Sequence, residues 1–434
     1  MDIAFPKSLF FGAVASAHEA EGGAVDTDWQ RWEQRPGRIR GDATSATAAG
    51  HYERFAQDFA LARQFGHTAH LFTVEWARVE PRPGAFDEDA LRHYAAVAST
   101  LRGLGITPYC ALHHVTLPRW IADGGGWTSA ETVERFAAYA RRVIAAIGSD
   151  CAAWIPLLDP MYAIMRGYGL GDWPPERTGL GIARGRAVTH VVAAHLAAWR
   201  AIKEADSAHQ VGVSIRATRS EPVDPDSAWD LRAAWRWDAF AAWLLPDAVL
   251  GVRPRIGVPH AEDTPAADFI GLAWGGRHRV RFAALRPASL CAVATPLADL
   301  REAGTGLDAM LAETATYGAP IVVTGIDLTA PDDATRCVLL LDRLREIRCA
   351  MRAGADVRAV FARSLLDGFA WRDGYAARSG LFHVARDTLA RTPNDSAYLF
   401  KEVCETGGLR RGTLGRHCPH WEPLPNCEEP WPSG

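Results

Sequence analysis

Short apolar runs alternate along this chain with longer segments in which apolar residues recur every three or four positions. The runs predict strands and the longer segments predict helices, because a buried parallel strand is continuously apolar whereas a surface helix is periodic. Strands are predicted at 9–11, 70–74, 107–112, 153–157, 211–215, 268–272, 320–323 and 357–361. Eight strands separated by helices predict a single (β/α)8 TIM barrel of the α/β class.

Helix signals and the absence of linkers define the expected domain. Thr128 and Glu131 have the spacing of a capping box and predict a helix that runs to about residue 147. A second helix is predicted over 334–353, closed by Gly354. No repeat or low-complexity linker divides the chain. We therefore expect one barrel over residues 1–406 and a short irregular C-terminal extension over 407–434.

Composition narrows the function classes. The 434 residues are 48% hydrophobic and 23% charged, with a net charge of −4, so we expect no nucleic-acid partner. No apolar run reaches the roughly 20 residues of a membrane span. Cysteines such as Cys110 and Cys337 lie in apolar segments, which favours reduced thiols and a cytoplasmic location. The His-Cys-Pro-His run at 417–420 fits no standard zinc spacing, so we predict no metal and no cofactor.

Candidate site residues should follow the predicted strands, since barrels of this type work at the carboxyl ends of their strands. Ordered motifs stand at these places: Ser-Ala-His-Glu-Ala-Glu-Gly at 16–22, Glu-Trp-Ala-Arg at 75–78, Leu-His-His at 112–114, Asp-Phe-Ile-Gly at 268–271 and Ser-Leu-Leu-Asp-Gly-Phe-Ala-Trp at 364–371. In this order, from Phe5 to about Val403, they resemble the β-glucosidases of glycoside hydrolase family 1. The resemblance implies a barrel with a sugar pocket and a small-molecule glycoside or sugar-like ligand.

The two catalytic positions of the family differ in this chain. Family members hydrolyse β-glycosides with two glutamates roughly 5–5.5 Å apart, a nucleophile and an acid/base. The nucleophile belongs to a Thr-Glu-Asn-Gly motif, and here Thr324 is followed by Gly325. The acid/base belongs to an Asn-Glu-Pro motif, and here Asp159 stands between Leu158 and Pro160. Since glycine has no carboxylate, we do not expect retaining hydrolysis.

The resemblance also assigns binding positions, some of them changed. Arg78, His114 and Trp371 match the family and are predicted to bind substrate. Glu19 replaces a glutamine, and Arg363 replaces an aromatic sugar platform. Because a guanidinium fork suits carboxylates, Arg363 favours an anionic ligand. The alternative is an internal ion pair between Arg363 and Glu19 or Asp159.

Two functions remain open from the sequence. The leading prediction is an enzyme that acts on a glycoside or a sugar-like, acidic metabolite by a non-retaining mechanism. It would use Asp159 as acid/base with Glu19, either for inverting hydrolysis by a water above Gly325 or for elimination or rearrangement. The rival is a non-catalytic carbohydrate-binding or scaffold barrel. An open pocket in which Asp159 and Glu19 face each other favours the enzyme, whereas acids neutralised by Arg363 and Arg78, with apolar chains filling the remaining space, favour the rival. The oligomeric state is not predicted.

Overall fold

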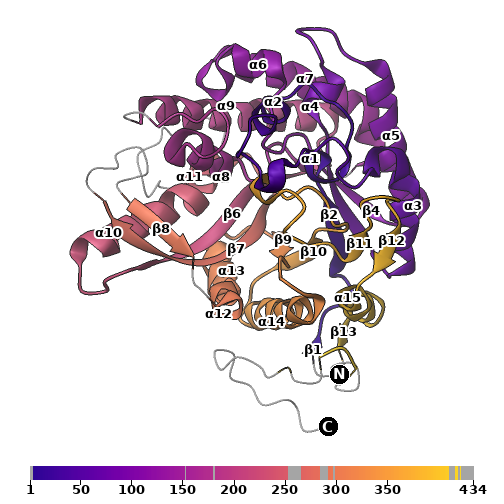
Figure 1. Cartoon of the computed structure of the whole chain (residues 1–434), viewed down its shortest axis with the longest axis vertical. Helices are drawn as coiled ribbons and strands as arrows, with labels where there is room; N and C mark the ends of the chain where they lie inside the picture. Colours follow the sequence, from indigo (N-terminus) through magenta and orange to yellow (C-terminus); the bar gives the residue numbers. More distant parts are fainter. Residues whose placement is uncertain are drawn as a thin grey trace.

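The computed structural model describes residues 3–151, 153–178, 181–252, 265–283, 292–296, 299–409, 416–418 and 421. Within these residues eight parallel strands form a closed barrel (Figure 1). Strand β10 pairs with β2 and strand β6 pairs with β7, which closes the sheet on itself. All eight predicted strands are present, and the predicted fold class is confirmed. In barrel order they are β2 (Phe10–Ala15), β3 (Ala69–Thr73), β4 (Thr107–Ala111), β5 (Ala153–Ile155), β6 (Gln210–Pro222), β7 (Phe269–Phe282), β9 (Ile321–Asp327) and β10 (Val357–Arg363).

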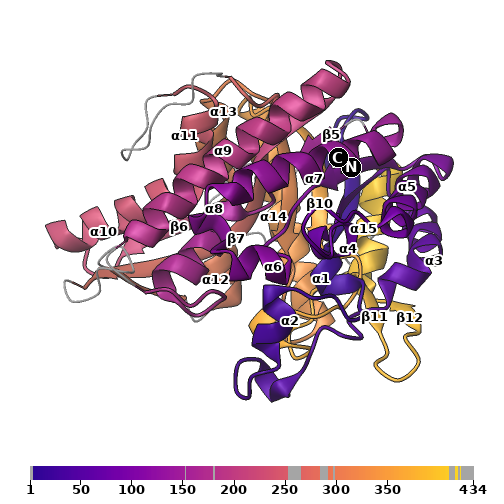
Figure 2. The same ribbon diagram turned by 90° about the horizontal axis from the view of Figure 1, so that it is seen from above.

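Apolar side chains fill the barrel, and helices cover its outside (Figure 2). The interior cluster includes Leu71, Ile155 and Phe361, each fully buried, so the interior of the barrel is a packed core. The longer covering helices are α3 (His51–Gln64), α5 (Glu88–Gly103), α7 (Glu131–Ile147), α9 (Ile182–Ala205), α13 (Leu307–Ala315), α14 (Asp333–Arg352) and α15 (Asp395–Thr406). The shorter helices are α1 (Ala17–Ala20), α2 (Asp28–Glu33), α4 (Trp76–Val79), α6 (Arg119–Asp123), α8 (Pro160–Met165), α11 (Leu244–Val249) and α12 (Leu300–Gly304).

The two helices predicted in detail are present, but one begins differently. Helix α7 starts at Glu131, and Thr128 lies before it in a 3-10 turn, where its hydroxyl donates to Gly125 O at 2.6 Å. Thr128 therefore forms no capping box, and that part of the prediction is wrong. Helix α14 ends at Arg352, and Gly354 follows with a φ of +106°, a backbone conformation that glycine adopts without strain.

Strands β6 and β7 continue past the barrel as a two-stranded arm. Their pairing runs as far as Pro222 and Val280, and β8 (Ala292–Pro296) adds to β7 in antiparallel orientation. Helix α10 (Ala228–Asp238) packs on this arm, away from the barrel axis (Figures 1 and 2). Arg216 lies on β6 just before this arm, opposite Ala273 of β7.

The ends of the barrel segment meet at a small sheet. Strand β1 (Ile3–Ala4) pairs with β13 (Gly408–Leu409), and β11 (Phe382–Val384) pairs with β12 (Arg391–Pro393). Most of the predicted extension at 407–434 lies outside the described residues. Five described cysteines are free thiols, whereas Cys349 is disulfide-bonded. Since disulfides are rare in cytoplasmic proteins, the location stays a prediction. Within the described ranges, no helix has the length and apolar character of a membrane span.

Candidate functional site

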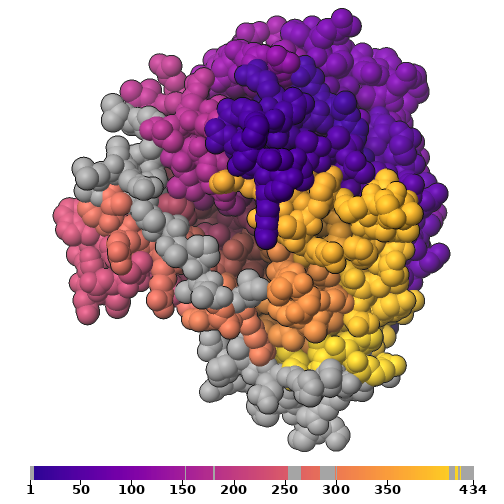
Figure 3. All heavy atoms as spheres, in the orientation of Figure 1, coloured from indigo at the N-terminus to yellow at the C-terminus, as the bar shows by residue number. Residues whose placement is uncertain are grey.

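A cavity of about 240 Å³ lies at the carboxyl ends of the barrel strands. The side of the molecule seen in Figure 3 is hollowed near its centre, where N-terminal, central and C-terminal segments meet. The cavity lining is rich in charge, and its described residues include as many acids as arginines. The charged ones are Glu19, Asp159, Asp327, Asp373, Arg166, Arg216, Arg363 and Arg372. Such a lining excludes a purely apolar ligand and provides hydrogen-bonding groups for a polar one.

The backbone at Gly325 is covered by an arginine side chain. Gly325 lies in β9 opposite Ala273 of β7. A Cβ atom added at Gly325 would lie 3.4 Å from Arg363 Cδ and 3.5 Å from Arg363 Cβ. The aliphatic part of Arg363, at the end of β10, therefore packs above the glycine, where the sequence suggested room for a catalytic water. The position that the resemblance gives to a nucleophile thus lies beneath a cation.

Asp159 is buried at the end of β5 and held in one orientation. It is 1% exposed, and its φ of +51° and ψ of +37° place it in the left-handed region, which aspartate tolerates better than most residues. Its backbone N–H donates to Ser214 Oγ at 3.1 Å, and Ser214 Oγ donates back to Asp159 Oδ1 at 3.3 Å. Asp159 Oδ2 accepts from Arg363 Nη1 at 2.9 Å and lies 3.8 Å from Arg216 Nη1. The carboxylate is therefore shared by two guanidinium groups.

Arg216 and Asp327 form a second ion pair in the same lining. Arg216 Nη2 lies 3.3 Å from Asp327 Oδ2, and its guanidinium carbon lies 4.8 Å from the ring centre of Tyr162. Burial acts to raise the pKa of Asp327, but the charges of Arg216 and Arg363 and the hydrogen bonds from Thr329 together lower it. Neither residue was among the predicted site residues. Arg216 directly follows the predicted strand at 211–215, so the strand-end rule could have found it.

Arg363 joins three predicted site residues. Besides Asp159, its Nη2 lies 3.6 Å from Glu19 Oε2 and 3.4 Å from His114 Nε2. Burial acts to lower the pKa of Arg363, but the carboxylates of Glu19 and Asp159 raise it, so the guanidinium stays charged. Glu19 is placed by a close backbone contact, because Phe369 N donates to Glu19 O at 2.7 Å. The internal ion pair left open by the sequence is thus present, and it engages both acids.

His114 is neutral, and its tautomer follows from its two neighbours. Burial first, and then the charge of Arg363, hold the pKa of His114 well below its ordinary value. Arginine only donates hydrogen bonds, so the contact at 3.4 Å makes His114 Nε2 the acceptor. The proton therefore lies on Nδ1, which donates to Ser16 Oγ at 2.7 Å. Both ring nitrogens are engaged by protein, and a ligand must compete for them.

Trp371 lines the cavity but is largely covered by other rings. It stacks on Trp173 at a centroid distance of 5.3 Å and on His18 at 5.0 Å, with interplanar angles of 25° and 24°. His114 meets it edge-on at 5.5 Å. Since much of the indole face packs against protein, Trp371 offers mainly an edge to a ligand.

Arg78 is the predicted binding residue that the structure places elsewhere. It is not among the residues that line the cavity. Its Nε donates to Glu21 Oε2 at 2.8 Å, its Nη2 donates to Gly22 O, and its guanidinium carbon lies 4.1 Å from the ring centre of Tyr52. Tyr94 also donates to Glu21, at 3.0 Å. Arg78 therefore neutralises Glu21, a neighbour in the opening loop, and leaves Arg363 to Asp159 and Glu19.

The fold is a TIM barrel with a charged cavity at the carboxyl ends of its strands. The family model for glycosyl hydrolase family 1 matches residues 1–266 and 315–409. The chain belongs to glycosyl hydrolase family 1.

Known relatives cover almost the whole chain. Beta-glucosidase A of Acetivibrio thermocellus is 25% identical over 94% of this chain and 99% of its own. Thermostable beta-glucosidase B of Thermobispora bispora is 29% identical over 95% of this chain and 93% of its own. Among solved structures, a beta-glycosidase from Pyrococcus horikoshii superposes with a TM-score of 0.87, at 26% identity over 96% of this chain and 98% of that one.

Proposed function

We propose that this barrel binds a sugar-like small molecule in the strand-end cavity and does not hydrolyse β-glycosides by the retaining mechanism. The observation that carries the proposal is the position of Arg363, which packs above Gly325 and pairs with Asp159 and Glu19. Retaining hydrolysis requires a carboxylate below the sugar and a second, protonated carboxyl group beside the leaving oxygen. The first group is absent at Gly325, and Asp159 accepts from a guanidinium where an acid would donate.

The ligand class rests on the family and on the cavity. The relatives are named β-glucosidases and a β-glycosidase, which supports a sugar-like ligand here. A volume of about 240 Å³ is smaller than common drug-sized pockets and suits one small polar ring. An acidic group on that ring could replace Glu19 at Arg363, because the Glu19 contact of 3.6 Å is longer than the Asp159 contact of 2.9 Å.

A second candidate function is a non-retaining enzyme with Asp159 as acid/base. The observation that favours it is that Asp159 and Glu19 line one cavity and meet at a single guanidinium. If an acidic ligand drew Arg363 away, both carboxylates would lose their shared cation and become available for proton transfer. Elimination, rearrangement or inverting hydrolysis would then use Asp159 and Glu19 in opposite roles.

Calorimetric titration with D-glucose and D-glucuronate tests the binding proposal. We expect saturable binding of glucuronate that weakens roughly ten- to hundredfold in Arg363→Met, since charge-assisted hydrogen bonds contribute roughly 1.5–3 kcal/mol. Arg78→Met is the matched control, because it removes an arginine from the same face but outside the cavity lining. The proposal would be contradicted if neither sugar binds, or if the two variants lose the same affinity for glucuronate. Turnover of a bound ligand, lost in Asp159→Asn, would establish the second candidate.

A further inference from the structure

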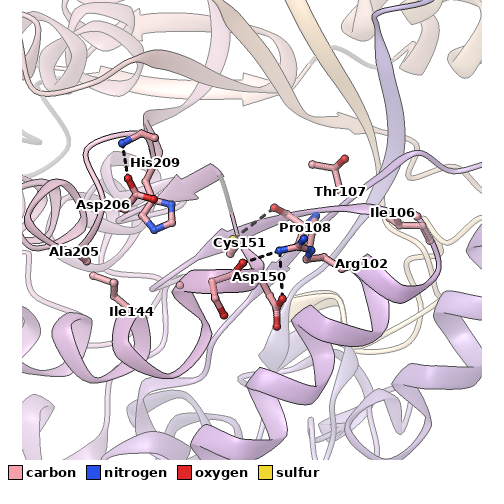
Figure 4. Close-up of a pocket in the computed structure, with 14 residues that line it drawn as sticks. Arg102, Ile106, Thr107, Pro108, Ile144, Asp150, Cys151, Ala205, Asp206 and His209 are labelled. Atoms are coloured by element: carbon pink, nitrogen blue, oxygen red, sulfur yellow. Dashed lines mark hydrogen bonds and ion pairs between the residues drawn. The ribbon is translucent and has the colours of Figure 1, made fainter.

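A cavity larger than the candidate site lies where the barrel strands begin, on the opposite side of the barrel (Figure 4). Its volume is about 710 Å³, and its lining includes Pro108 of β4 and His209, which precedes β6. Arg102 pairs with Asp150 there at 3.4 Å. None of the described residues that line it has a buried side-chain atom without a hydrogen-bond partner. The cavity therefore offers a ligand no unsatisfied buried group.

The arm beside the barrel, in contrast, presents apolar side chains to solvent on helix α10. Leu231, Trp235 and Trp229 are 48%, 50% and 63% exposed. The opposite face of the helix, which includes Ala233 and Trp237, is buried on the side of β6 and β7. Single exposed apolar residues are common on soluble proteins, whereas three on one helix of 11 residues are typical of an interaction surface. The helix lies at the edge of the molecule in both views (Figures 1 and 2).

The strands that support α10 lie between the two segments that match the family model. The first matched segment ends at residue 266 and the second begins at residue 315, and β7 and β8 lie between these limits. Trp229 of α10 stacks on Phe282 of β7, with ring centres 5.0 Å apart. The apolar face of α10 thus rests on a segment that departs from the family pattern. Neither the family resemblance nor the proposed function assigns it a role.

Charged residues at the two ends of α10 have opposite signs. Asp224 and Asp226 are exposed just before the helix, and Arg232 and Arg236 are exposed in its second half. Among the described residues, no ion pair involves any of these four side chains. A partner that covers the apolar face should therefore carry positive charge near the start of α10 and negative charge near its end. A second copy of α10 in antiparallel orientation has this distribution.

A two-fold axis beside Leu231 would place two copies of α10 in matching register. Residues equally far from the axis then face each other, because a two-fold interface uses the same surface on both subunits. Leu231 meets Leu231 of the second copy, Trp235 covers the small Ala228 of the second copy, and Arg236 comes within reach of its Asp226. From this self-complementarity we propose that the exposed face of α10 is the contact surface of a homodimer.

The small size of this surface predicts a weak dimer. A helix of 11 residues is roughly 16 Å long, so one helix pair buries less than the roughly 1,200 Å² of the smaller stable interfaces. We therefore expect a dissociation constant on the order of 10–100 μM. Sedimentation velocity of the full chain, over a concentration range of about 2 to 400 μM, measures this equilibrium.

Replacement of Trp235 by aspartate tests the apolar part of the surface. We expect Trp235→Asp to weaken association at least about thirtyfold, because a tryptophan inside an interface commonly contributes most to binding. Ile182→Asp is the matched control, since Ile182 is 66% exposed but lies on α9, away from the arm. The control should associate as the wild type does.

Two charge reversals test the antiparallel arrangement. Arg236→Asp alone places two acids opposite each other twice, and Asp226→Arg alone places two arginines opposite each other twice. Each variant alone should therefore associate about tenfold more weakly than the wild type. An equimolar mixture of the two variants restores opposite charges at both contacts, so it should form a mixed dimer of nearly wild-type affinity. The double variant should associate with itself equally well.

Each contrary result would overturn a stated part of the proposal. A wild-type chain that stays monomeric at about 400 μM would exclude the homodimer. A dimer that is unaffected by Trp235→Asp would form through another surface. Two weakened charge variants whose mixture does not recover would exclude the antiparallel two-fold. A monomer that sediments with vesicles of anionic phosphatidylglycerol, and loses this in Trp235→Asp, would replace the second copy by a lipid surface.

Discussion

Replacement of Arg363 by methionine is expected to destabilise the fold through Asp159. The variant keeps the aliphatic length that packs above Gly325 but removes the guanidinium. Asp159 is 1% exposed and would retain only Ser214 and the more distant Arg216, at 3.8 Å. Removing one partner of a buried ion pair commonly costs 3–5 kcal/mol. Because Arg216 compensates in part, we expect a loss of about 3 kcal/mol.

A double-mutant cycle isolates this pair from general effects of the substitution. Asp159→Asn alone should cost about 2 kcal/mol, because Arg363 keeps Glu19 as a partner. In the double variant neither charge is left unpaired, so the cost should be smaller than the sum by about 2 kcal/mol. Urea unfolding followed by tryptophan fluorescence measures the four midpoints, of the wild type and the three variants, and the free energies are comparable if the slopes are equal. Additivity within about 0.5 kcal/mol would refute the reasoning.

Three further predictions concern Glu75, Arg78 and the activity of Asp159. Burial raises the pKa of Glu75 to about 7 from an ordinary 4.5, so the folded chain binds an extra proton between these values. The free energy of unfolding should therefore fall as pH rises from 4.5 to 7. In Glu75→Gln, urea midpoints should depend less on pH over this range. An unchanged pH dependence would exclude Glu75 as the cause. Arg78→Met should lower the unfolding midpoint, because it leaves the 7% exposed Glu21 without its cation, yet leave the glucuronate affinity intact; a tenfold weaker affinity would place Arg78 in the site. Asp159→Asn should abolish turnover of any substrate found, as measured by NMR of the product, and unchanged turnover would remove Asp159 from the mechanism.

The barrel could be predicted from sequence because its strands are buried on both sides. Runs such as 320–323 and 357–361 are continuously apolar for this reason, and they reappear in β9 and β10. The positions at which the strands end were less predictable. Strand β6 runs to Pro222 although the apolar run stops at residue 215, because the arm beyond the barrel is partly exposed and carries polar side chains.

The lining of the cavity was predictable only in part, because Arg78 lies outside it and Arg216 was not predicted. Glu19, His114, Asp159, Arg363 and Trp371 all line one cavity, as their positions after the strands indicated. Motif spacing does not specify where a long side chain points, and both orientations of Arg363 were open from the sequence. Its pairing with two acids depends on contacts between strands far apart in the chain.

Arg78 is a second residue whose side-chain direction could not be predicted from the sequence. Its position matches the family, but its direction is set by Glu21, a buried acid of the opening loop. Local propensity does not reveal which of several nearby acids an arginine will pair with, because the pairing depends on how all the side chains at the rim of the barrel pack. Arg216 was missed for a different reason, since no family motif marks it.

The stereochemical outcome of a chromogenic glucoside assay tests the central claim most directly. Incubation with 4-nitrophenyl β-D-glucoside, followed by proton NMR of the released sugar, reports both rate and anomeric configuration. With Gly325 beneath Arg363, we predict no release above the uncatalysed rate. Rapid release of the β-anomer would show retaining chemistry and would contradict the account.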